Sequence, residues 1–548
     1  MVVELSSLDY IVIGIYFILL LCIGFFLSSF VKDLSSYLKG SSTIPWVISG
    51  VANFMARCST FIFVAYAGIA HEEGLISIVV LWSTVPACIF ASLFLAKRWR
   101  RAKVISPVEY LETRFNTPVH QLSTWSGLFI RLLDNMVRLY AIGIFLCAVT
   151  PLSMNEALII TGVLIVLFTM FGGLWSVTVM STVQFIALIL ITIILLPLSL
   201  KEVGGINGIA EAVPGHIDIF NGAKGAPLWL IAYYVMITIK YNSSWAFIQR
   251  LYCVKDEKSA VKVGYLTGGL FLVFSIVFLL PAVASKVMFP DIPDKEMSYI
   301  MVSAKLLPSG LMGFMVASLL STTVSTLNAE YNAISSVLTK DIFVKFFKIS
   351  LSEKEKLHYA HLATIIVGGI VLTGSLFIGH IGGVFEANKL FTGMFAIPVG
   401  VPLVLGLLIK RTSSNGAFAT IILGVLVGVI LNLFPDNYIP WEIATLVEIC
   451  FCIVVFILWP SSRNPDYRLK VESFFKRITT SIPKNEIPQI DLSLKKSLIN
   501  IFPFSFLACG IFFIVISFSS LHSDSGLYAL VAGCCSLVLS IIVRFGIK

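Results

Sequence analysis

Charged residues are scarce in this chain of 548 residues, in which Asp, Glu, Lys and Arg together make up only 13%. Soluble domains carry roughly a quarter. The scarcity is concentrated in repeated apolar runs of about 20 residues, the length needed to cross a hydrocarbon core of roughly 30 Å. With 57% hydrophobic residues and a mean hydropathy of +0.94, the chain does not fit the soluble globular class. We expect an all-α integral membrane protein.

The chain also lacks the residue patterns of disulfide scaffolds, metal centres and enzymes. Its ten cysteines lie in or beside apolar runs and form no CxxC pair, so we interpret them as small packing residues. The seven histidines are scattered, and no HExxH or His/Asp cluster occurs. We therefore expect no enzyme activity, no cofactor and no metal other than a coupling ion. The first residues, MVVELSSLDY, lack the basic region of a cleaved signal peptide, so we expect the first apolar run to be retained.

Basic residues give a net charge of +9, but they are placed in alternate loops. About fifteen apolar segments are expected to span the membrane, near residues 10–30, 44–71, 74–97, 120–148, 155–172, 176–200, 226–250, 264–288, 308–343, 357–379, 384–409, 415–434, 441–460, 500–519 and 526–545. Basic clusters follow the odd-numbered segments, at 97–103, 250–262, 340–356, 410–411 and 463–484. The positive-inside rule assigns these loops to the cytoplasm. The pattern predicts a multi-pass protein of the cytoplasmic (plasma) membrane, N-terminus outside and C-terminus inside, with no nucleic-acid partner.

Two expected spans are interrupted by polar residues near their middle. The second contains Asn53, Arg57, Ser59 and Thr60, and the seventh contains Lys240, Asn242, Ser243 and Ser244. Polar residues inside a membrane helix usually mark a functional site, although Ser and Asn also join neighbouring helices. The two segments are five spans apart, as expected if two inverted five-helix repeats each open with a discontinuous helix. The unwound backbone of such a helix binds a cation and a polar solute.

The ninth span carries a third interruption, a run of hydroxyl side chains at Ser318, Ser321, Thr322 and Ser325. Their spacing of three and four residues places them on one face of a helix. Hydroxyl and carbonyl oxygens suit a sodium ion. The alternative is that each hydroxyl donates a hydrogen bond back to its own helix.

Three stretches carry a resemblance to a known family: GGLWSVTVMSTVQF (172–185), FIQRLYCVKDEKSA (247–260) and SLLSTTVSTLNAEYNAISSVLTKDIF (318–343). The chain resembles the sodium/solute symporter family, which includes sodium-coupled transporters of sugars, proline, iodide and sialic acid. The resemblance implies a LeuT-type core of ten helices over 44–409, with repeats over 44–200 and 226–409. Residues 410–548 are expected to form accessory helices within one membrane domain, 1–548.

The same resemblance implies a sodium site. Its ligands would be the carbonyls of Met55, Cys58 and Ser318 with the side chains of Ser321 and Thr322. Members with a second sodium site have an Asp three residues before the Gln of the sixth span.

In this chain the position of that Asp is Ser181. Val324 replaces one of the two hydroxyls of the second site and leaves Ser325 without its neighbour. We therefore expect one sodium ion per transport cycle. Because no carboxylate is recognised in the ion site, sodium is favoured over a proton as the coupling ion.

Cations dominate the positions that we expect to face the solute. The candidate substrate-binding residues are Arg57, Ser59, Arg138, Lys240, Tyr241 and Lys389. Positions that bind sugar in relatives match the apolar Ile62, Leu81, Ile237 and Phe271 here, which disfavours a neutral hexose. Asp134 could instead neutralise Arg138, and Glu386 could neutralise Lys389, at one turn's distance. Lys240 has three interpretations: solute contact, an influence on sodium coupling, or a pair with an unidentified residue.

These observations predict a sodium-coupled symporter that imports a small polar solute by alternating access, with an anionic sugar acid or another carboxylate favoured. The alternatives are a proton-coupled or uncoupled transporter, a symporter for a neutral sugar or polyol, and a channel. A loop of about 40 residues after the thirteenth span is too short for the output domain of a sensor. The expected partners are sodium, the solute and the lipid bilayer.

Overall fold

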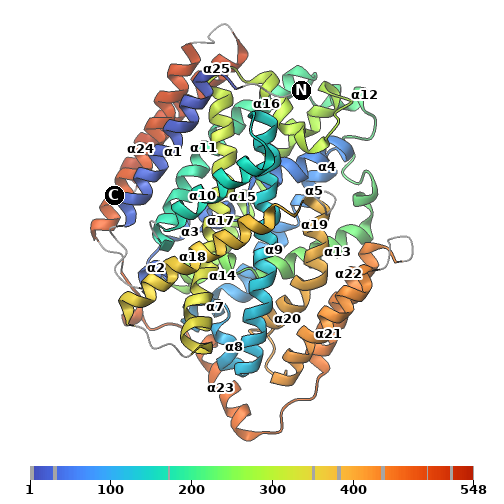
Figure 1. Cartoon of the computed structure of the whole chain (residues 1–548), viewed down its shortest axis with the longest axis vertical. Helices are drawn as coiled ribbons and strands as arrows, with labels where there is room; N and C mark the ends of the chain where they lie inside the picture. The colour runs from blue at the N-terminus through green and yellow to red at the C-terminus, as the bar shows by residue number, and fades with distance from the viewer. Residues whose placement is uncertain are drawn as a thin grey trace.

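A computed structural model describes residues 5–28, 34–170, 173–347, 352–378, 384–433, 439–489, 492–518 and 523–546 (Figure 1). In these ranges the chain is helical, apart from turns, loops and one isolated backbone pairing between Ile44 and Val254. Twelve of the described helices are long and apolar enough to cross a membrane. They are Ser7–Leu27, Ile76–Ala102, Thr117–Val149, Gly173–Glu202, Glu257–Met288, Leu311–Phe346, Glu355–Ser375, Val384–Leu405, Ser414–Asn432, Trp441–Leu458, Asn500–Phe518 and Asp524–Phe545. The expectation of a multi-pass all-α membrane protein is confirmed.

The three remaining expected spans are built differently. α10 (Met154–Met170) is apolar but shorter than the other spans. The second and seventh expected spans are each divided into shorter helices. The count of fifteen spans therefore stays a prediction, because length and apolar composition identify twelve.

The second span breaks where the sequence places its polar residues. α3 (Trp46–Met55) ends before a non-helical stretch at 56–59, and the chain continues through the π-helical segment η2 (Ile62–Tyr66) into α4 (Ala67–Glu73). Gly74 ends α4 with a φ of 79°, and a Cβ there would lie 2.0 Å from the carbonyl oxygen of His216. Only glycine fits this turn.

The seventh span breaks in the same manner. α13 (Pro227–Asn242) stops at Ser243 and Ser244, and α14 (Trp245–Tyr252) begins directly after them. Both expected interruptions are thus present in the structure. Each leaves backbone carbonyls of the preceding helix without intrahelical donors.

α17 (Leu311–Val337) lies at the centre of the fold, and all of its residues are buried. It packs against α1 (Ser7–Ser28), α9 (Thr117–Val149), α11 (Gly173–Glu202) and α18 (Glu353–Ser375). On one side of Figure 1, α24 (Leu492–Phe518) and α25 (Asp524–Gly546) lie beside α1. On the other side, α21 (Ser414–Leu433) and α22 (Trp441–Leu458) lie against α20 (Ile397–Leu405). Helices on both sides therefore enclose α17 and the two interrupted spans.

The loops expected on one side of the membrane gather at one end of the molecule. Arg101 bonds Glu257 at 3.1 Å and the carbonyl of Thr479 at 2.7 Å, which joins three of the basic loops. The Lys340 ammonium lies 2.7 Å from Glu109. Lys410 lies 3.3 Å from Glu472 of α23 (Pro465–Thr479). The loops after the third, seventh, ninth, eleventh and thirteenth expected spans therefore share one end, as predicted.

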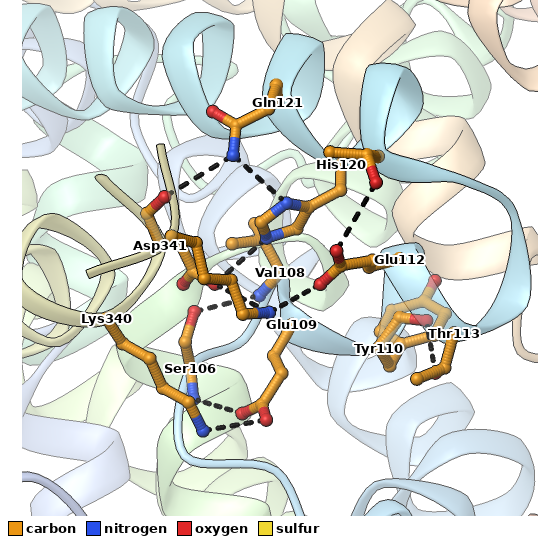
Figure 2. Close-up of polar contacts among 12 residues, drawn as sticks. Ser106, Val108, Glu109, Tyr110, Glu112, Thr113, His120, Gln121, Lys340 and Asp341 are labelled. Atoms are coloured by element: carbon orange, nitrogen blue, oxygen red, sulfur yellow. Dashed lines mark hydrogen bonds and ion pairs between the residues drawn. The ribbon is translucent and has the colours of Figure 1, made fainter. Parts of the chain in front are cut away.

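Figure 2 shows the polar cluster that joins α8 (Glu109–Arg114) to the end of the ninth span, the π-helical segment η6 (Leu338–Phe346). His120 Nε2 lies 2.9 Å from the Asp341 carboxylate, and both side chains are buried. Gln121 donates to the Asp341 carbonyl at 3.4 Å. Together with the Lys340–Glu109 pair, these contacts attach the end of the ninth span to its neighbours.

Candidate functional site

A single hydroxyl on α17 lies among three carbonyl oxygens at the break in α3. The Thr326 hydroxyl is 2.9 Å from the Met55 carbonyl, 3.2 Å from the Cys58 carbonyl and 3.0 Å from the Thr322 carbonyl. A hydroxyl has one proton, so it cannot satisfy three acceptors at once. A buried cluster of four oxygens with one proton is a set of hard ligands such as alkali and alkaline-earth cations prefer.

The structure brings together only part of the expected sodium-ligand set. Met55, Cys58 and Thr322 meet, but Thr322 contributes its carbonyl, since its hydroxyl donates to Leu319 at 2.7 Å. The residue that joins them is Thr326, which the sequence reasoning missed. The sequence feature that could have indicated Thr326 is its position four residues after Thr322, on the same helical face.

Ser321 and Ser318 lie elsewhere. The Ser321 hydroxyl donates to the Ser318 carbonyl at 2.8 Å and accepts from Tyr16 of α1 at 3.0 Å. Five residues separate Ser321 from Thr326, which at about 100° per residue turns the two side chains roughly 140° apart on the helix. The expected convergence of Ser318 and Ser321 with the α3 carbonyls is not found. The alternative of bonding back to the helix applies to Ser321 and to the hydroxyl of Thr322.

The altered positions of the second sodium site lie between α17 and α11. The Ser325 hydroxyl donates to the Ser181 hydroxyl at 2.7 Å, and both residues are buried. Val324 is also buried. Neither serine carries a charge, so this pair has no counter-charge of its own for a cation.

A carboxylate that the sequence reasoning overlooked lies between the two interrupted spans. Glu330 Oε1 is 2.9 Å from Arg57 Nη2, and it accepts from the Ser244 hydroxyl at 3.3 Å. Both charged side chains are buried. Arg57 belongs to the break in α3 and Ser244 to the break in α13, so one carboxylate oxygen contacts both. Glu330 follows Thr326 by one turn of α17, so a carboxylate lies near the ion site, although it is not among the oxygens that surround the Thr326 hydroxyl.

Lys240 is held by a second group of polar residues. Its ammonium donates to Asn388 of α19 (Val384–Phe391) at 2.7 Å and to Thr392 at 2.8 Å. It also lies 3.4 Å from Asp134. Asp134 accepts a hydrogen bond from Arg138 at 2.8 Å. This is the alternative in which Asp134 neutralises Arg138. These contacts identify the partners of Lys240, all of which lie on elements distant in sequence.

Positive charge exceeds negative charge in this buried region. Arg131, which the sequence reasoning did not single out, donates to the carbonyl of Ser243 in the α13 break at 3.2 Å. Among the described residues that contact the two breaks or Lys240, four buried cations accompany two buried carboxylates, an excess of two positive charges; they are Arg57, Arg131, Arg138 and Lys240, with Asp134 and Glu330. Arg250, which is also buried, adds a further cation near Glu330. The described residues leave Arg138 Nη1 and Nε without a hydrogen-bond partner. Buried charge of this kind is costly without a counter-ion.

The other substrate candidates divide into two groups. The Tyr241 ring lies 5.3 Å from the Arg57 guanidinium and therefore belongs to the cluster. Ser59 is buried in the α3 break, where its hydroxyl accepts from the backbone N–H of Phe61. Lys389 instead pairs with Glu386 at 2.5 Å and lies over the Trp441 ring. The structure does not bring Lys389 to the cluster, because it contacts Trp441 while its neighbour Asn388 contacts Lys240.

Comparisons with known proteins bear on the family and the fold. Residues 37–424 match the model of the Sodium:solute symporter family. A Sodium/glucose cotransporter of Vibrio parahaemolyticus is 21% identical over 502 residues, covering 84% of this chain and 92% of the relative. Sodium/glucose cotransporter 1 of Ovis aries is 24% identical over 477 residues, covering 77% and 71%. The solved structure of a Na+-coupled sialic acid symporter, substrate-bound and outward-open, superposes with a TM-score of 0.73 at 18% identity, covering 84% of this chain and 99% of that one.

Proposed function

The chain belongs to the Sodium:solute symporter family, and we propose that it couples the sodium gradient to the import of a small anionic solute, such as a sugar acid or another carboxylate. Sodium-coupled symport follows from the family. The observation that carries the anionic solute is the excess of two positive charges in the buried cluster. A neutral sugar would leave that excess uncompensated, whereas a carboxylate would neutralise part of it.

We propose that sodium binds where the α3 break meets α17. Its ligands are the carbonyls of Met55, Cys58 and Thr322 and the hydroxyl of Thr326, whose oxygens converge in the structure. Ser325 lies next to Thr326 on α17, but its hydroxyl is engaged with Ser181. One sodium ion per cycle remains our proposal, because the Ser181–Ser325 pair supplies no charge for a second.

The solute's acidic group would be held by the free guanidinium nitrogens of Arg138, with Arg57 and Lys240 beside it. Arginine presents paired N–H donors that match the two oxygens of a carboxylate. Tyr241 and Ser59 complete the proposed contacts from the cluster and the α3 break. Of the candidate substrate-binding residues expected from the sequence, Lys389 has the least structural support, since it lies against Trp441.

Glu330 supports a physical link between the two ligands. It contacts Arg57, which directly precedes Cys58, and it lies one turn from Thr326 on α17. A cation among the oxygens of Met55, Cys58 and Thr326 would fasten the α3 break to α17 and thereby hold Arg57 in its place. Sodium binding would in this way prepare the site for the acidic solute, and the reverse holds by linkage.

The remaining assignments follow from this proposal. The end that carries the basic loops faces the cytoplasm, with the N-terminus outside and the C-terminus inside, in the plasma membrane. Residues 44–409 form the transport core, with repeats over 44–200 and 226–409, and 410–548 form accessory helices. We assign the chain no enzymatic reaction, because its family consists of transporters.

A thermal-shift screen tests the proposal with purified protein. Each sugar acid is compared with its neutral parent sugar, in sodium and in potassium. We expect acids alone to raise the unfolding temperature, and more so in sodium. Stabilisation by neutral parents, with none by any acid, would overturn the anionic solute.

A second candidate is proton coupling, which the position of Glu330 favours. Glu330 already has the Arg57 guanidinium as its counter-charge at 2.9 Å, so sodium remains our proposal. Solute accumulation driven by an inward proton gradient in sodium-free buffer would reverse this choice.

A further inference from the structure

A second buried carboxylate lies outside the transport cluster, in the accessory helix α22. Glu448 is in the middle of this apolar span and is fully buried. Neither of its carboxylate oxygens has a hydrogen-bond partner among the described residues. An ionised carboxylate without a partner is strongly disfavoured in an apolar interior. An ionisable residue in a membrane span usually has a function.

A backbone carbonyl, which is a hydrogen-bond acceptor, lies in the surroundings of Glu448. A Cβ on Gly428 of α21 would lie 2.6 Å from Glu448 Oε1 and 3.0 Å from the Met394 carbonyl oxygen, so glycine makes room for both groups. The nearby amide of Asn432 is engaged, because it donates to the Gly428 carbonyl at 2.7 Å. An ionised Glu448 would therefore face the negative end of a carbonyl dipole.

The Met394 carbonyl belongs to an irregular part of its helix. It lies in the π-helical segment η8 (Thr392–Ala396), where the Ile397 N–H bonds to Thr392. In an α-helix the Met394 carbonyl would accept from residue 398. That residue is Pro398, which has no N–H. The carbonyl at which the regular hydrogen-bond ladder is interrupted thus lies, like Glu448 Oε1, against Gly428.

We propose that Glu448 is a proton-binding site: it carries a proton and donates a hydrogen bond to the Met394 carbonyl. A protonated carboxyl group has one O–H donor and is neutral, which suits both the carbonyl and the apolar surroundings. The bond fastens α22 to η8. Because Thr392 of η8 accepts from Lys240 at 2.8 Å, the same bond supports the group that holds Lys240.

Few other titratable groups face this position. α21, α20 and η8 contain none along their whole length. On α22, Cys452 lies one turn beyond Glu448, and Glu442 lies in the first turn. α13 contributes Tyr233, whose ring is 6.3 Å from Trp441, and Lys240, which is bonded to Thr392. The unfolded chain releases the Glu448 proton near the ordinary pKa of a carboxyl group, whereas the folded protein keeps it. The stability that this group contributes is therefore complete below that ordinary pKa and falls as the pH rises, until the folded protein loses the proton as well.

The direct test is infrared spectroscopy of the purified protein at neutral pH, with E448Q and the matched control E442Q on the same helix. We expect a protonated-carboxyl band in the wild type and in E442Q that is missing in E448Q. The side-chain amide introduced by E448Q can still donate a hydrogen bond to the Met394 carbonyl. We therefore expect E448Q to fold, and to show a smaller fall in unfolding temperature between mildly acidic and alkaline pH than the wild type shows.

The wild-type titration decides the matter even without a folded variant. While the band persists, stability should fall by up to about 1.4 kcal/mol per pH unit for one proton, which is a factor of about ten in the folding equilibrium, and the fall should level off where the band weakens. A wild type without the band, an E448Q that retains it, or a band that is lost before stability begins to fall would each overturn the proposal. These readouts need no solute, so they fail or succeed independently of the proposed function.

Discussion

Replacing Thr326 by valine removes one hydroxyl and preserves the shape of the side chain. In the structure this hydroxyl lies within 3.2 Å of three carbonyl oxygens, those of Met55, Cys58 and Thr322. Losing one partner of a buried polar group costs about 1–3 kcal/mol. If that cost falls on the sodium-bound state, sodium affinity drops about 5- to 150-fold. The assay is sodium binding to purified T326V, followed with radioactive sodium.

Ser321→Ala is the matched control, since it removes a hydroxyl from the same helix. Ser321 faces Tyr16 of α1 rather than the α3 break, so we expect S321A to bind sodium as the wild type does. Unfolding temperatures of both variants confirm that they are folded. Weakened sodium binding in S321A with normal binding in T326V would refute the assignment and restore the ligand set expected from the sequence.

Three further predictions concern charged positions. Glu330→Gln leaves Arg57 buried without its counter-charge and should destabilise the protein by about 3–5 kcal/mol, measured by chemical unfolding, because breaking one partner of a buried pair is costly; a loss below about 1 kcal/mol would contradict the pairing. Ser181→Asp should add a counter-charge beside the neighbouring serine of α17 and raise the sodium-to-solute flux ratio from one to two, and an unchanged ratio with normal folding would count against our account of the missing second site. Burial raises the pKa of Glu109, but the opposing effect of Lys340 and two backbone N–H groups is larger. The pKa of Glu109 is therefore lowered overall. The stability that this carboxylate contributes is present above its ordinary pKa and is lost as the pH falls through the lowered value. Glu109→Gln should therefore reduce the fall in unfolding temperature at acidic pH. An unchanged fall would contradict this prediction.

The interrupted spans were predictable because polar residues in an apolar run have few structural explanations. Arg57 and Ser243 mark the two breaks in the sequence itself. The gathering of the basic loops was predictable for a similar reason, since loop charge follows topology.

The register of the sodium ligands was harder to predict. Hydroxyls recur so often between Ser318 and Thr326 that two ligand sets, one turn apart, fit the sequence almost equally well. Only the packing of α17 against α3 distinguishes the two registers, through the contacts of Thr326 on one face and of Ser321 on the other.

Most partners of the buried charges could not be predicted from the sequence. Arg57 and Glu330 are 273 positions apart in the sequence, and Lys240 and Asn388 are 148 positions apart. Pairs within one helical turn, such as Asp134 with Arg138, were predictable from spacing. Contacts between distant spans depend on how the helices pack, which periodicity does not specify.

Uptake into proteoliposomes tests the central claim most directly. Labelled sugar acids, each paired with its neutral parent sugar, are offered to vesicles with an inward sodium gradient or an equal potassium gradient. We predict that at least one acid accumulates transiently above its external concentration, with sodium alone, and that its parent sugar does not. Accumulation of a neutral sugar with no acid transported, or equal uptake in potassium, would contradict sodium-coupled import of an anion.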